Sequence, residues 1–195
     1  MQLVKGMTIL IVGYGNIGAA TAKILKNGFG MKVIGVTADP QLIDDEQRSY
    51  LDELVTPDKY DRYIGQADFV LGLLPKTPAT VGFFNMKTTF SKMKKSAVFM
   101  NIGRGPTHKC SDLIEALKTK VISGAVLDVF ETEPLPASSE LWAMENVLMT
   151  PHCADRIGGV NGDWLVECMH LFARNLSNFC EGRPIFNVTN KEKGY

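Results

Sequence analysis

Side chains that can bind an anion or move a proton follow three separate apolar segments of this sequence. Arg104 stands between two glycines, Glu131 and Glu133 follow an apolar stretch that ends near Asp128, and His152 follows another. If these segments are strands of an open α/β sheet, a ligand binds beyond their carboxyl ends, where these side chains would lie. A guanidinium can hold a carboxylate, and an imidazole can transfer a proton.

A glycine-rich turn near the N-terminus offers a second kind of chemistry. An apolar run leads into Gly13, Gly15 and Gly18 in the pattern G-x-G-x-x-G, and a helix-forming stretch follows. The first glycine permits a tight turn, the second lets the backbone approach a pyrophosphate, and the third lets helix and strand pack closely. We expect the amides of Asn16 and Ile17 to lie nearest to the phosphates of a dinucleotide.

The end of the second apolar run bears on the choice of dinucleotide. The position usually held by an acidic residue that binds the adenosine ribose falls on Thr37, and the nearest carboxylate is Asp39. Asp39 could bend back to the ribose, or Asp39-Pro40 could simply form a helix-entry turn. Because no arginine at 37–39 would receive a 2′-phosphate, the sequence favours NAD, with NADP as the alternative.

Alternation of short apolar runs with longer amphipathic segments predicts the elements that must position these groups. The pattern is typical of βαβ units and a doubly wound parallel sheet, the Rossmann-type dinucleotide-binding fold. Ser111 is a plausible N-cap of the fourth helix. We expect six strands, at 8–12, 32–36, 69–74, 97–102, 123–129 and 147–149, and helices at 16–26, 44–54, 87–93, 111–118 and 162–181.

Composition limits the classes of function. With 195 residues and 45% hydrophobic content, the chain can bury one large core, so we expect one dinucleotide-binding domain over residues 1–195. Basic and acidic residues balance at 21 each, which predicts no nucleic-acid or membrane partner. The N-terminal apolar run is too short to span a membrane and lacks a signal-peptide cleavage site, so we expect a soluble, cytoplasmic protein. The four cysteines show no C-x-x-C spacing, and no metal site is predicted.

Five motifs together carry a family resemblance: VGYGNIG, LLPKTPAT, NIGRG, LDVFETEPLP and TPH. In this order and approximate spacing they resemble the D-2-hydroxyacid dehydrogenases, which include phosphoglycerate dehydrogenase, glycerate or hydroxypyruvate reductases and D-lactate dehydrogenase. The resemblance spans nearly the whole chain. It implies an oxidoreductase that transfers a hydride, with D-stereospecificity, between NAD(P)H and a small 2-oxo or 2-hydroxy acid.

The resemblance also implies roles for individual residues. Arg104 matches the arginine that holds the substrate's carboxylate and carbonyl, a task suited to a bidentate fork. His152 matches the general acid that protonates the keto oxygen, and Glu133 matches the carboxylate that orients this histidine. Asp128 matches a contact to the nicotinamide end. Positions that line the cofactor in the family fall on Leu74, Pro75, Thr80, Ile102 and Gly103.

Some residues depart from the family pattern or invite a simpler interpretation. Cys153 follows His152 where many relatives have a small glycine-containing turn, and the stretch after Gly105, which includes His108, is more polar than the usual continuation. We interpret His108 as a loop residue and His170 as a helix residue without a functional role. Glu131 is expected to face solvent, and the aromatic residues at 83–90 are expected to form a helix that packs on the sheet.

The family's second domain, which covers the substrate, finds no counterpart in this sequence. The glycine turn begins almost at once, so we expect cofactor binding but feeble turnover by the 195-residue chain alone. A homodimer and a possible separate substrate domain are expected partners. The alternative from another class is a catalytically weak NAD(H)-sensing or corepressor-like scaffold of the same family. A formate-type dehydrogenase is disfavoured because a glutamate rather than a glutamine stands at 133.

Overall fold

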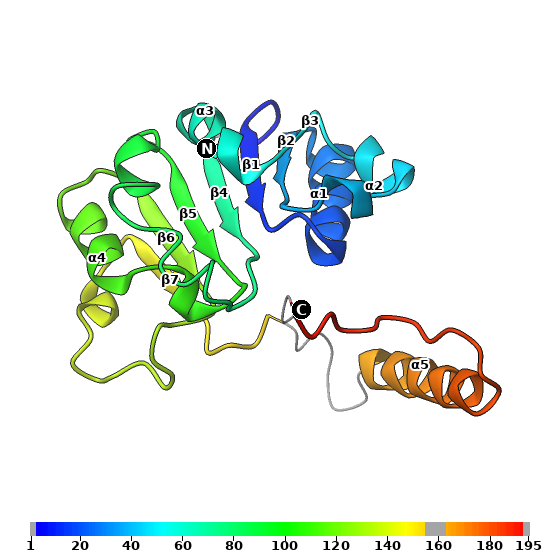
Figure 1. Ribbon diagram of the computed structural model, residues 1–195. Helices are drawn as coiled ribbons and strands as arrows, with labels where there is room; N and C mark the ends of the chain where they lie inside the picture. Colours follow the sequence, from blue (N-terminus) through cyan, green and yellow to red (C-terminus); the bar gives the residue numbers. More distant parts are fainter. Residues whose placement is uncertain (1–2, 155–162, 193–195) are drawn as a thin grey trace. The chain divides into compact units, whose positions relative to one another are not determined.

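The computed structural model describes residues 3–154 and 163–192, and its contacts divide the chain into two compact units. The first unit runs to Pro151 and the second begins at His152. The first contains every strand of the described sheet, and the second contains one long helix (Figure 1). Each unit is described by itself below.

Seven parallel strands form the sheet of the first unit, in the spatial order β3-β2-β1-β4-β5-β6-β7. All six predicted strands are confirmed, three with the predicted bounds and three one or two residues shorter at their ends. The doubly wound, Rossmann-type arrangement is therefore confirmed, and all carboxyl ends lie along one edge. The strands are β1 Thr8–Val12, β2 Lys32–Val36, β3 Glu53–Val55, β4 Phe69–Gly72, β5 Val98–Asn101, β6 Gly124–Leu127 and β7 Val147–Met149.

Helices cover both faces of this sheet because the strands alternate their apolar side chains between two core clusters. Ile9 and Ile11 of β1 pack with α1 (Asn16–Phe29), while Leu10 and Val12 belong to the cluster that includes α3 (Tyr60–Tyr63) and α4 (Cys110–Lys118). Each large side chain fully buried in this way stabilises the fold by about 1.5–3 kcal/mol. Successive side chains of β1 point to opposite faces of the sheet, so β1 is packed on both faces and the glycine turn at its end is firmly positioned.

The helix predicted at 44–54 is wrong over its second half. Asp44 and Gln47 form a capping box that starts α2 (Asp45–Ser49), with a hydrogen bond of 2.8 Å from the Gln47 amide to Asp44 Oδ1. The chain then turns and forms β3, which pairs in parallel with β2. Pairing with β2 overrode the local helix propensity of this segment. The segment therefore forms a seventh strand, which we did not predict.

The helix predicted at 87–93 is also wrong. The Asn85 side chain accepts the amide of Thr88 at 2.9 Å, and the segment contains only a 3-10 turn at Phe90–Lys92. Side chains that bond nearby backbone in this way compete with helix formation. Phe84 and Phe90 are nevertheless fully buried against the sheet, as their apolar character predicted.

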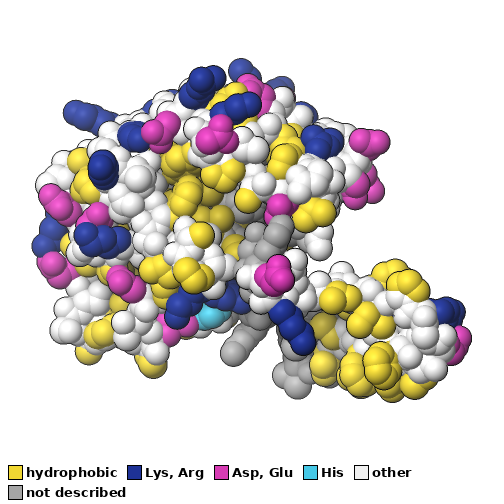
Figure 2. All heavy atoms as spheres, in the orientation of Figure 1, with side chains coloured by type: hydrophobic (Ala, Val, Ile, Leu, Met, Phe, Trp, Pro, Cys, Tyr) yellow, Lys and Arg dark blue, Asp and Glu magenta, His cyan; other side chains and the backbone are white. Residues whose placement is uncertain are grey.

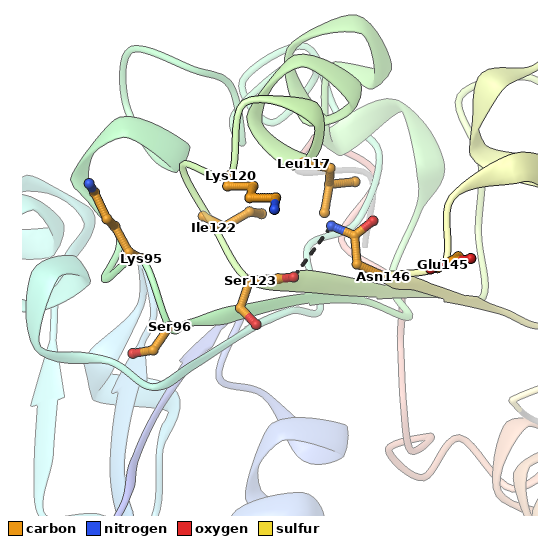
Figure 3. Close-up of a pocket in the computed structure, with 8 residues that line it drawn as sticks. All are labelled: Lys95, Ser96, Leu117, Lys120, Ile122, Ser123, Glu145 and Asn146. Carbon is orange, nitrogen blue, oxygen red and sulfur yellow. Dashed lines mark hydrogen bonds between the residues drawn. The ribbon is translucent and has the colours of Figure 1, made fainter.

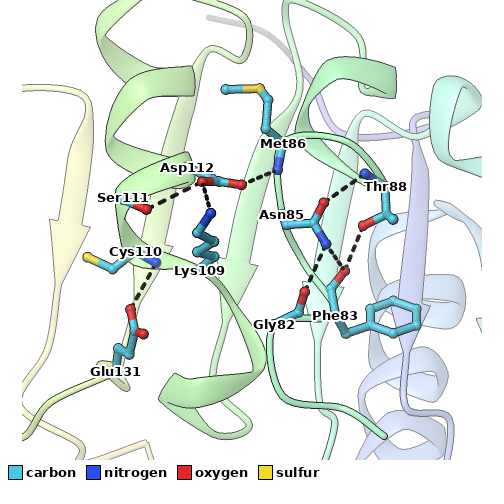
Figure 4. A network of polar contacts seen from close by, with 10 residues as sticks. All are labelled: Gly82, Phe83, Asn85, Met86, Thr88, Lys109, Cys110, Ser111, Asp112 and Glu131. Carbon is cyan, nitrogen blue, oxygen red and sulfur yellow. Dashed lines mark hydrogen bonds and ion pairs between the residues drawn. The ribbon is translucent and has the colours of Figure 1, made fainter.

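The start of α4 differs from the prediction by one residue. Lys109 occupies the N-cap without a side-chain cap, and Ser111 lies inside the helix, bonded to Asp112 rather than to the first turn. The Glu131 carboxylate accepts the amide of Cys110 at 3.1 Å instead (Figure 4). A distant carboxylate therefore caps this helix and interacts favourably with its positive end.

In the second unit the predicted terminal helix is α5, Asp163–Cys180; its predicted first residue, Gly162, lies outside the described residues. The chain turns at Gly182, whose φ is +68°, and returns along the helix. Asn175 holds this return by bonding both backbone groups of Phe186, at 3.0 and 2.9 Å. Phe172 and Phe179 are among the exposed apolar side chains of α5, and Figure 2 shows hydrophobic side chains gathered over this helix.

Candidate functional site

The glycine turn has the local geometry that its three glycines predict. Gly13 has φ +101°, and a Cβ there would lie 2.7 Å from the carbonyl carbon of Leu73. A Cβ on Gly18 would lie 3.3 Å from the Ile11 side chain, so α1 packs closely on β1. A Cβ on Gly15 would meet nothing within 4 Å. Two glycines therefore serve packing, whereas Gly15 faces open space where a ligand could approach.

The first turn of α1 presents backbone donors at this open position. The first intrahelical bond of the helix runs from the Ala19 amide to the Gly15 carbonyl, at 2.8 Å. The amides of Asn16, Ile17 and Gly18 precede that bond and lack a carbonyl one turn earlier in the helix. Together with the positive end of the helix dipole, they form a suitable site for a phosphate group.

Helix α2 is attached to the glycine turn by Tyr14. The Tyr14 hydroxyl donates to the Gln47 carbonyl at 2.7 Å, and Gln47 Nε2 donates to Asn16 Oδ1 at 3.2 Å. Burial, reinforced by the Asp44 carboxylate, raises the pKa of Tyr14 to about 12, so the hydroxyl remains a donor at neutral pH. A Cβ on Gly35 would lie 2.8 Å from the Tyr14 ring, which explains the glycine in β2.

At the carboxyl end of β2, Thr37 and Asp39 form a short turn. Thr37 Oγ1 accepts the Asp39 amide at 3.3 Å, and Asp39 Oδ1 accepts Gln41 Nε2 at 3.3 Å. Asp39 precedes a 3-10 turn, Pro40–Leu42, so the helix-entry turn considered above is formed. Both residues stand at the sheet edge where an adenosine ribose would lie.

Arg48 is a cation near this edge that the sequence interpretation missed. Its guanidinium donates to the carbonyls of Pro40 and of Ile43, the latter at 3.0 Å. The side chain therefore folds back over the connection that carries Asp39. Because Arg48 is distant in sequence from the second strand, no local motif signals its position.

The connection after β4 carries three of the predicted cofactor-lining residues. The Thr80 hydroxyl donates to the Pro75 carbonyl at 2.6 Å and accepts the Thr77 amide at 2.8 Å. Leu74, Pro75 and Thr80 are all partly buried. The Thr80 side chain thus closes the turn that presents Leu74 and Pro75 at the carboxyl edge of the sheet.

Backbone at Leu73 and Leu74 joins the glycine turn to the Arg104 loop. Gly13 approaches it from one side, and a Cβ on Gly103 would lie 2.9 Å from the Leu74 carbonyl oxygen and 3.0 Å from the Leu73 carbonyl carbon. Both approaches require glycine. The structure therefore brings the glycine turn, Leu74 and the residue before Arg104 together around one peptide segment.

Arg104 lies exposed at the carboxyl end of β5, as predicted. Its Nη1 donates to the Gly103 carbonyl at 2.7 Å, and the guanidinium has further N–H groups with which to bind an anion. Ile102, the neighbouring predicted cofactor residue, donates its amide to the Gly72 carbonyl at 3.3 Å and packs on the α1 side of the sheet. Arg104 and Ile102 thus extend from the same loop into different environments, one exposed and the other packed on the sheet.

The loop that carries Glu133 lies directly against the Arg104 loop. A Cβ on Gly105 would lie 1.7 Å from the Phe130 carbonyl oxygen, so the two backbones touch at this glycine. Glu133 Oε1 accepts the Phe130 amide at 2.9 Å, which folds the carboxylate back over its own loop. Three close glycine contacts therefore link the glycine turn, the Arg104 loop and the Glu133 loop.

Asp128 and Glu131 flank the same loop but differ in environment. Asp128 is 2% exposed, and its Oδ1 accepts the Thr150 hydroxyl at 2.5 Å. Glu131 is exposed, as predicted, yet it also caps α4 through Cys110 (Figure 4). Burial and the Glu131 carboxylate raise the pKa of the Cys110 thiol, which disfavours a reactive thiolate there.

His152 is the first residue of the second unit. It follows Pro151 directly, has φ +51° and is exposed. Positive φ is uncommon outside glycine, although histidine adopts it more readily than most residues. The pairing of His152 with Glu133 stays a prediction.

His108 has an environment that the sequence interpretation did not address. It lies in a loop, as expected, but it is 1% exposed and contacts the Asn101 side chain at 2.9 Å. Burial lowers the pKa of His108 to about 4, so the ring is neutral at physiological pH. His170, by contrast, is an exposed residue of α5.

Other kinds of site find little support in the described part of the chain. Within residues 3–154 and 163–192, no group of three metal-ligating side chains is placed to hold an ion, and no helix is long and apolar enough to cross a bilayer. Cys110, Cys168 and Cys180 are free thiols. Charges of both signs intermingle on the face shown in Figure 2.

A cavity of about 540 Å³ opens at the opposite edge of the sheet (Figure 3). Its polar lining includes Lys95, Lys120 and Ser123, and Ser123 immediately precedes β6. It therefore lies at the amino ends of the strands, whereas ligands of open α/β sheets bind at the carboxyl ends. It contains none of the predicted site residues.

Comparison with known proteins agrees with this geometry. Residues 1–154 match the sequence profile described as "D-isomer specific 2-hydroxyacid dehydrogenase, NAD binding domain". The chain is 35% identical over 190 residues to a glyoxylate reductase of Thermococcus litoralis, covering 96% of this chain and 53% of that protein. A glyoxylate/hydroxypyruvate reductase B of an Enterobacter species is 38% identical over 189 residues, covering 96% and 55%.

Solved structures show the same similarity in three dimensions. An NADPH-dependent glyoxylate/hydroxypyruvate reductase from Sinorhizobium meliloti, solved with NADP and sulfate, superposes with a TM-score of 0.83. It is 34% identical, and the alignment covers 97% of this chain and 57% of that one. The chain thus spans about half the length of the relatives that it matches.

Proposed function

Because this chain belongs to the D-isomer specific 2-hydroxyacid dehydrogenase family through its NAD-binding domain, we propose that it takes part in the reversible reduction of a small 2-oxo acid. The products are the D-2-hydroxy acid and the oxidised nicotinamide dinucleotide. Relatives named as glyoxylate or hydroxypyruvate reductases favour a two- or three-carbon substrate.

One observation carries the proposal: close glycine contacts join the dinucleotide turn to the loops that bear Arg104 and Glu133. Gly13 and Gly103 pack on the same Leu73–Leu74 backbone, and Gly105 packs on Phe130. A dinucleotide bound along the open side of Gly15 would run along this edge toward Arg104. Contacts this close leave little freedom in the spacing between the cofactor site and the substrate-binding arginine.

The nicotinamide dinucleotide fits the residues present on physical grounds. The open side of Gly15 and the amides of Asn16 and Ile17 would hold the pyrophosphate. Thr37 and Asp39 stand where the adenosine ribose would lie, and Leu74, Pro75, Thr80, Ile102, Gly103 and Asp128 would line the remaining length. When bound, the reduced cofactor supplies the hydride.

The chain's own side chains would bind and protonate the substrate. Arg104 would hold the carboxylate and the carbonyl oxygen of the 2-oxo acid with its exposed N–H groups. His152 would donate a proton to the carbonyl oxygen as the hydride reaches the carbon, and would recover it in the oxidation direction. Glu133 would orient His152 and favour its protonated form by opposite charge.

The preference between NAD and NADP depends on two opposed groups in the connection after β2. Asp39 would bind the ribose hydroxyls of NAD and repel a 2′-phosphate, whereas Arg48 would attract that phosphate. We propose NAD(P)H as the cofactor. Parallel titration of the chain with NADH and NADPH, followed by nicotinamide fluorescence, measures which group dominates.

Three further expectations belong to this proposal. We propose that a separate domain covers the other face of the substrate, that the protein forms a homodimer, and that it acts in the cytoplasm. Because an open cleft leaves the reacting carbon hydrated and loosely held, we expect the 195-residue chain alone to bind cofactor but turn over slowly.

The test uses cofactor binding first and turnover second. We expect NADH or NADPH to bind the chain, and glyoxylate, hydroxypyruvate or pyruvate to accelerate oxidation of the bound cofactor when a substrate-covering domain is joined to it. His152→Ala should lower turnover by about 10²- to 10⁴-fold without loss of cofactor affinity. Unchanged turnover in His152→Ala would refute the proposed role of His152, whereas absence of turnover with all three acids would favour a nucleotide-sensing scaffold instead.

A further inference from the structure

A buried polar cluster lies directly beneath Arg104 and contains Asn101, Thr107 and His108. These three side chains are 0%, 0% and 1% exposed, although all carry polar atoms. Burying polar groups is unfavourable unless they are hydrogen-bonded, so the contacts that they make are informative.

Every member of the cluster contacts the backbone of the Arg104 loop or a group that does. Asn101 Oδ1 accepts the Gly103 amide at 3.1 Å, and Asn101 Nδ2 donates to the Arg104 carbonyl at 3.3 Å. The Thr107 hydroxyl donates to the same Arg104 carbonyl at 2.6 Å and lies 3.3 Å from Asn101 Nδ2. The Asn101 amide therefore holds the loop on both sides of Arg104.

His108 fixes the orientation of that amide. Its Nδ1 lies 2.9 Å from Asn101 Nδ2, which is the shortest contact of the amide nitrogen. Because an amide NH₂ can only donate, Nδ1 must accept, and the ring proton resides on Nε2. Burial lowers the pKa of His108 to about 4, which keeps Nδ1 available as an acceptor.

The surroundings of His108 hold the ring in place. The ring contacts Phe99 edge-on, with centroids 6.1 Å apart, and the backbone at 107–109 exchanges hydrogen bonds with Phe84. These contacts lie within the core, away from the glycine turn. The hydrogen bonds given above for the three side chains reach the Arg104 loop, and none of them reaches the glycine turn at 13–18.

We propose that His108 is a positioning residue for Arg104, acting through the Asn101 side chain. His108 accepts from Asn101 Nδ2, the oriented Asn101 amide pins the backbone of Gly103 and Arg104, and the pinned backbone aims the guanidinium at the carboxylate of the 2-oxo acid. This inference rests on the proposed function, since it concerns the affinity of the same site for its acid substrate.

Two substitutions separate the acceptor at 108 from the volume of the ring. His108→Asn places an amide oxygen where Nδ1 lies but removes part of the ring, whereas His108→Leu keeps a similar volume and removes the acceptor. His170→Leu, the same change at an exposed histidine of α5, is the matched control. A merely structural role predicts that acid affinity follows thermal stability among these variants.

The measurement is a titration of the 195-residue chain, saturated with NADH, with oxamate, an unreactive analogue of a 2-oxo acid. Oxamate binding is followed by the NMR resonance of the Arg104 Nε–H group, which detects millimolar affinity. NADH affinity and thermal unfolding are measured on the same samples.

We expect His108→Leu to weaken oxamate binding about tenfold with NADH affinity unchanged, and we expect His108→Asn to bind within about threefold of the original chain even if it unfolds at a lower temperature. Equal oxamate affinity in His108→Leu and the original chain would overturn the inference, as would a loss in His108→Asn that matches that in His108→Leu. Absence of any Arg104 response in the original chain would instead refute the proposed function, and the inference with it.

Discussion

Replacement of Gly105 by alanine tests the contact that joins the Arg104 loop to the Glu133 loop. The added Cβ would lie 1.7 Å from the Phe130 carbonyl oxygen and 2.0 Å from its carbon, both backbone atoms that no rotamer change can remove. Since contacts under 3.0 Å essentially do not occur, the two backbones must separate by at least about 1.3 Å. Gly105 does not have positive φ, so this effect is steric rather than conformational.

The size of the effect follows from this displacement. Overpacking of a tight contact costs about 1–3 kcal/mol, and each kcal/mol lowers the melting temperature of a chain of this size by about 2–4 °C. A misplacement of about 1 Å in a substrate-positioning group costs about 10²-fold in rate. We therefore expect Gly105→Ala to remain folded, to bind NADH normally and to lose most of its affinity for oxamate.

Gly28→Ala is the matched control for this experiment. Gly28 lies in α1, and a Cβ there would meet nothing within 4 Å, so the substitution should stabilise the helix by about 0.5–1 kcal/mol. Calorimetric titration with oxamate and thermal unfolding are measured for both variants. Unchanged oxamate affinity and melting temperature in Gly105→Ala would refute the reasoning that this glycine sets the spacing of the two loops.

Four other substitutions test separate parts of the structure. Gly15→Ala should leave stability nearly unchanged but weaken NADH binding at least about tenfold, because its Cβ enters the proposed pyrophosphate space. Gly13→Ala should instead destabilise the fold, since its φ is +101° and its Cβ would lie 2.7 Å from Leu73. Fluorescence titration with NADH and thermal melts measure both effects, and equal behaviour of the two variants would contradict this prediction. The pKa of His108 falls from 6.5 to about 4 on folding, so the unfolded chain binds the proton more tightly below pH 6.5 and stability is lost as pH falls toward 4. Between pH 7 and pH 5, denaturant unfolding should show that the free energy of unfolding falls by about 2 kcal/mol less in His108→Asn than in the original chain. Equal decreases in the variant and the original chain would argue against this prediction. Asp44→Ala removes the Asp44 side chain from the capping box and should cost about 1 kcal/mol by the same measurement, while a cost near zero would mean that other contacts, such as the bond from Tyr14 to Gln47, hold α2 without the cap.

Local patterns in the sequence predicted most elements of the sheet and the edge on which the site lies. The unbroken apolar run that contains Ile9, Leu10 and Ile11 indicates a strand buried on both faces, and the glycine turn that follows requires the positive φ that Gly13 shows. Arg104 was placed correctly at the end of β5 because an apolar run and two glycines surround it. These features depend on neighbours within a few residues, so one sequence suffices to find them.

Other features depend on residues that are distant in the sequence. Strand β3 forms because β2 offers an edge to pair with, although its own segment resembles the end of a helix. Arg48 folds back onto Pro40 in the connection after β2, and Glu131 caps a helix that begins far from it. Neither the helix or strand propensity of a segment nor the sequence spacing within a motif identifies such distant partners.

The sequence alone therefore determined the class of fold, the glycine turn and the identity of the side chains at the strand ends. Only the tertiary structure decided that His108 is buried against Asn101 and that Gly105 lies against Phe130. Hydrophobic period and backbone conformation are local properties of a chain, whereas the distance between two loops is set by close packing of the whole core.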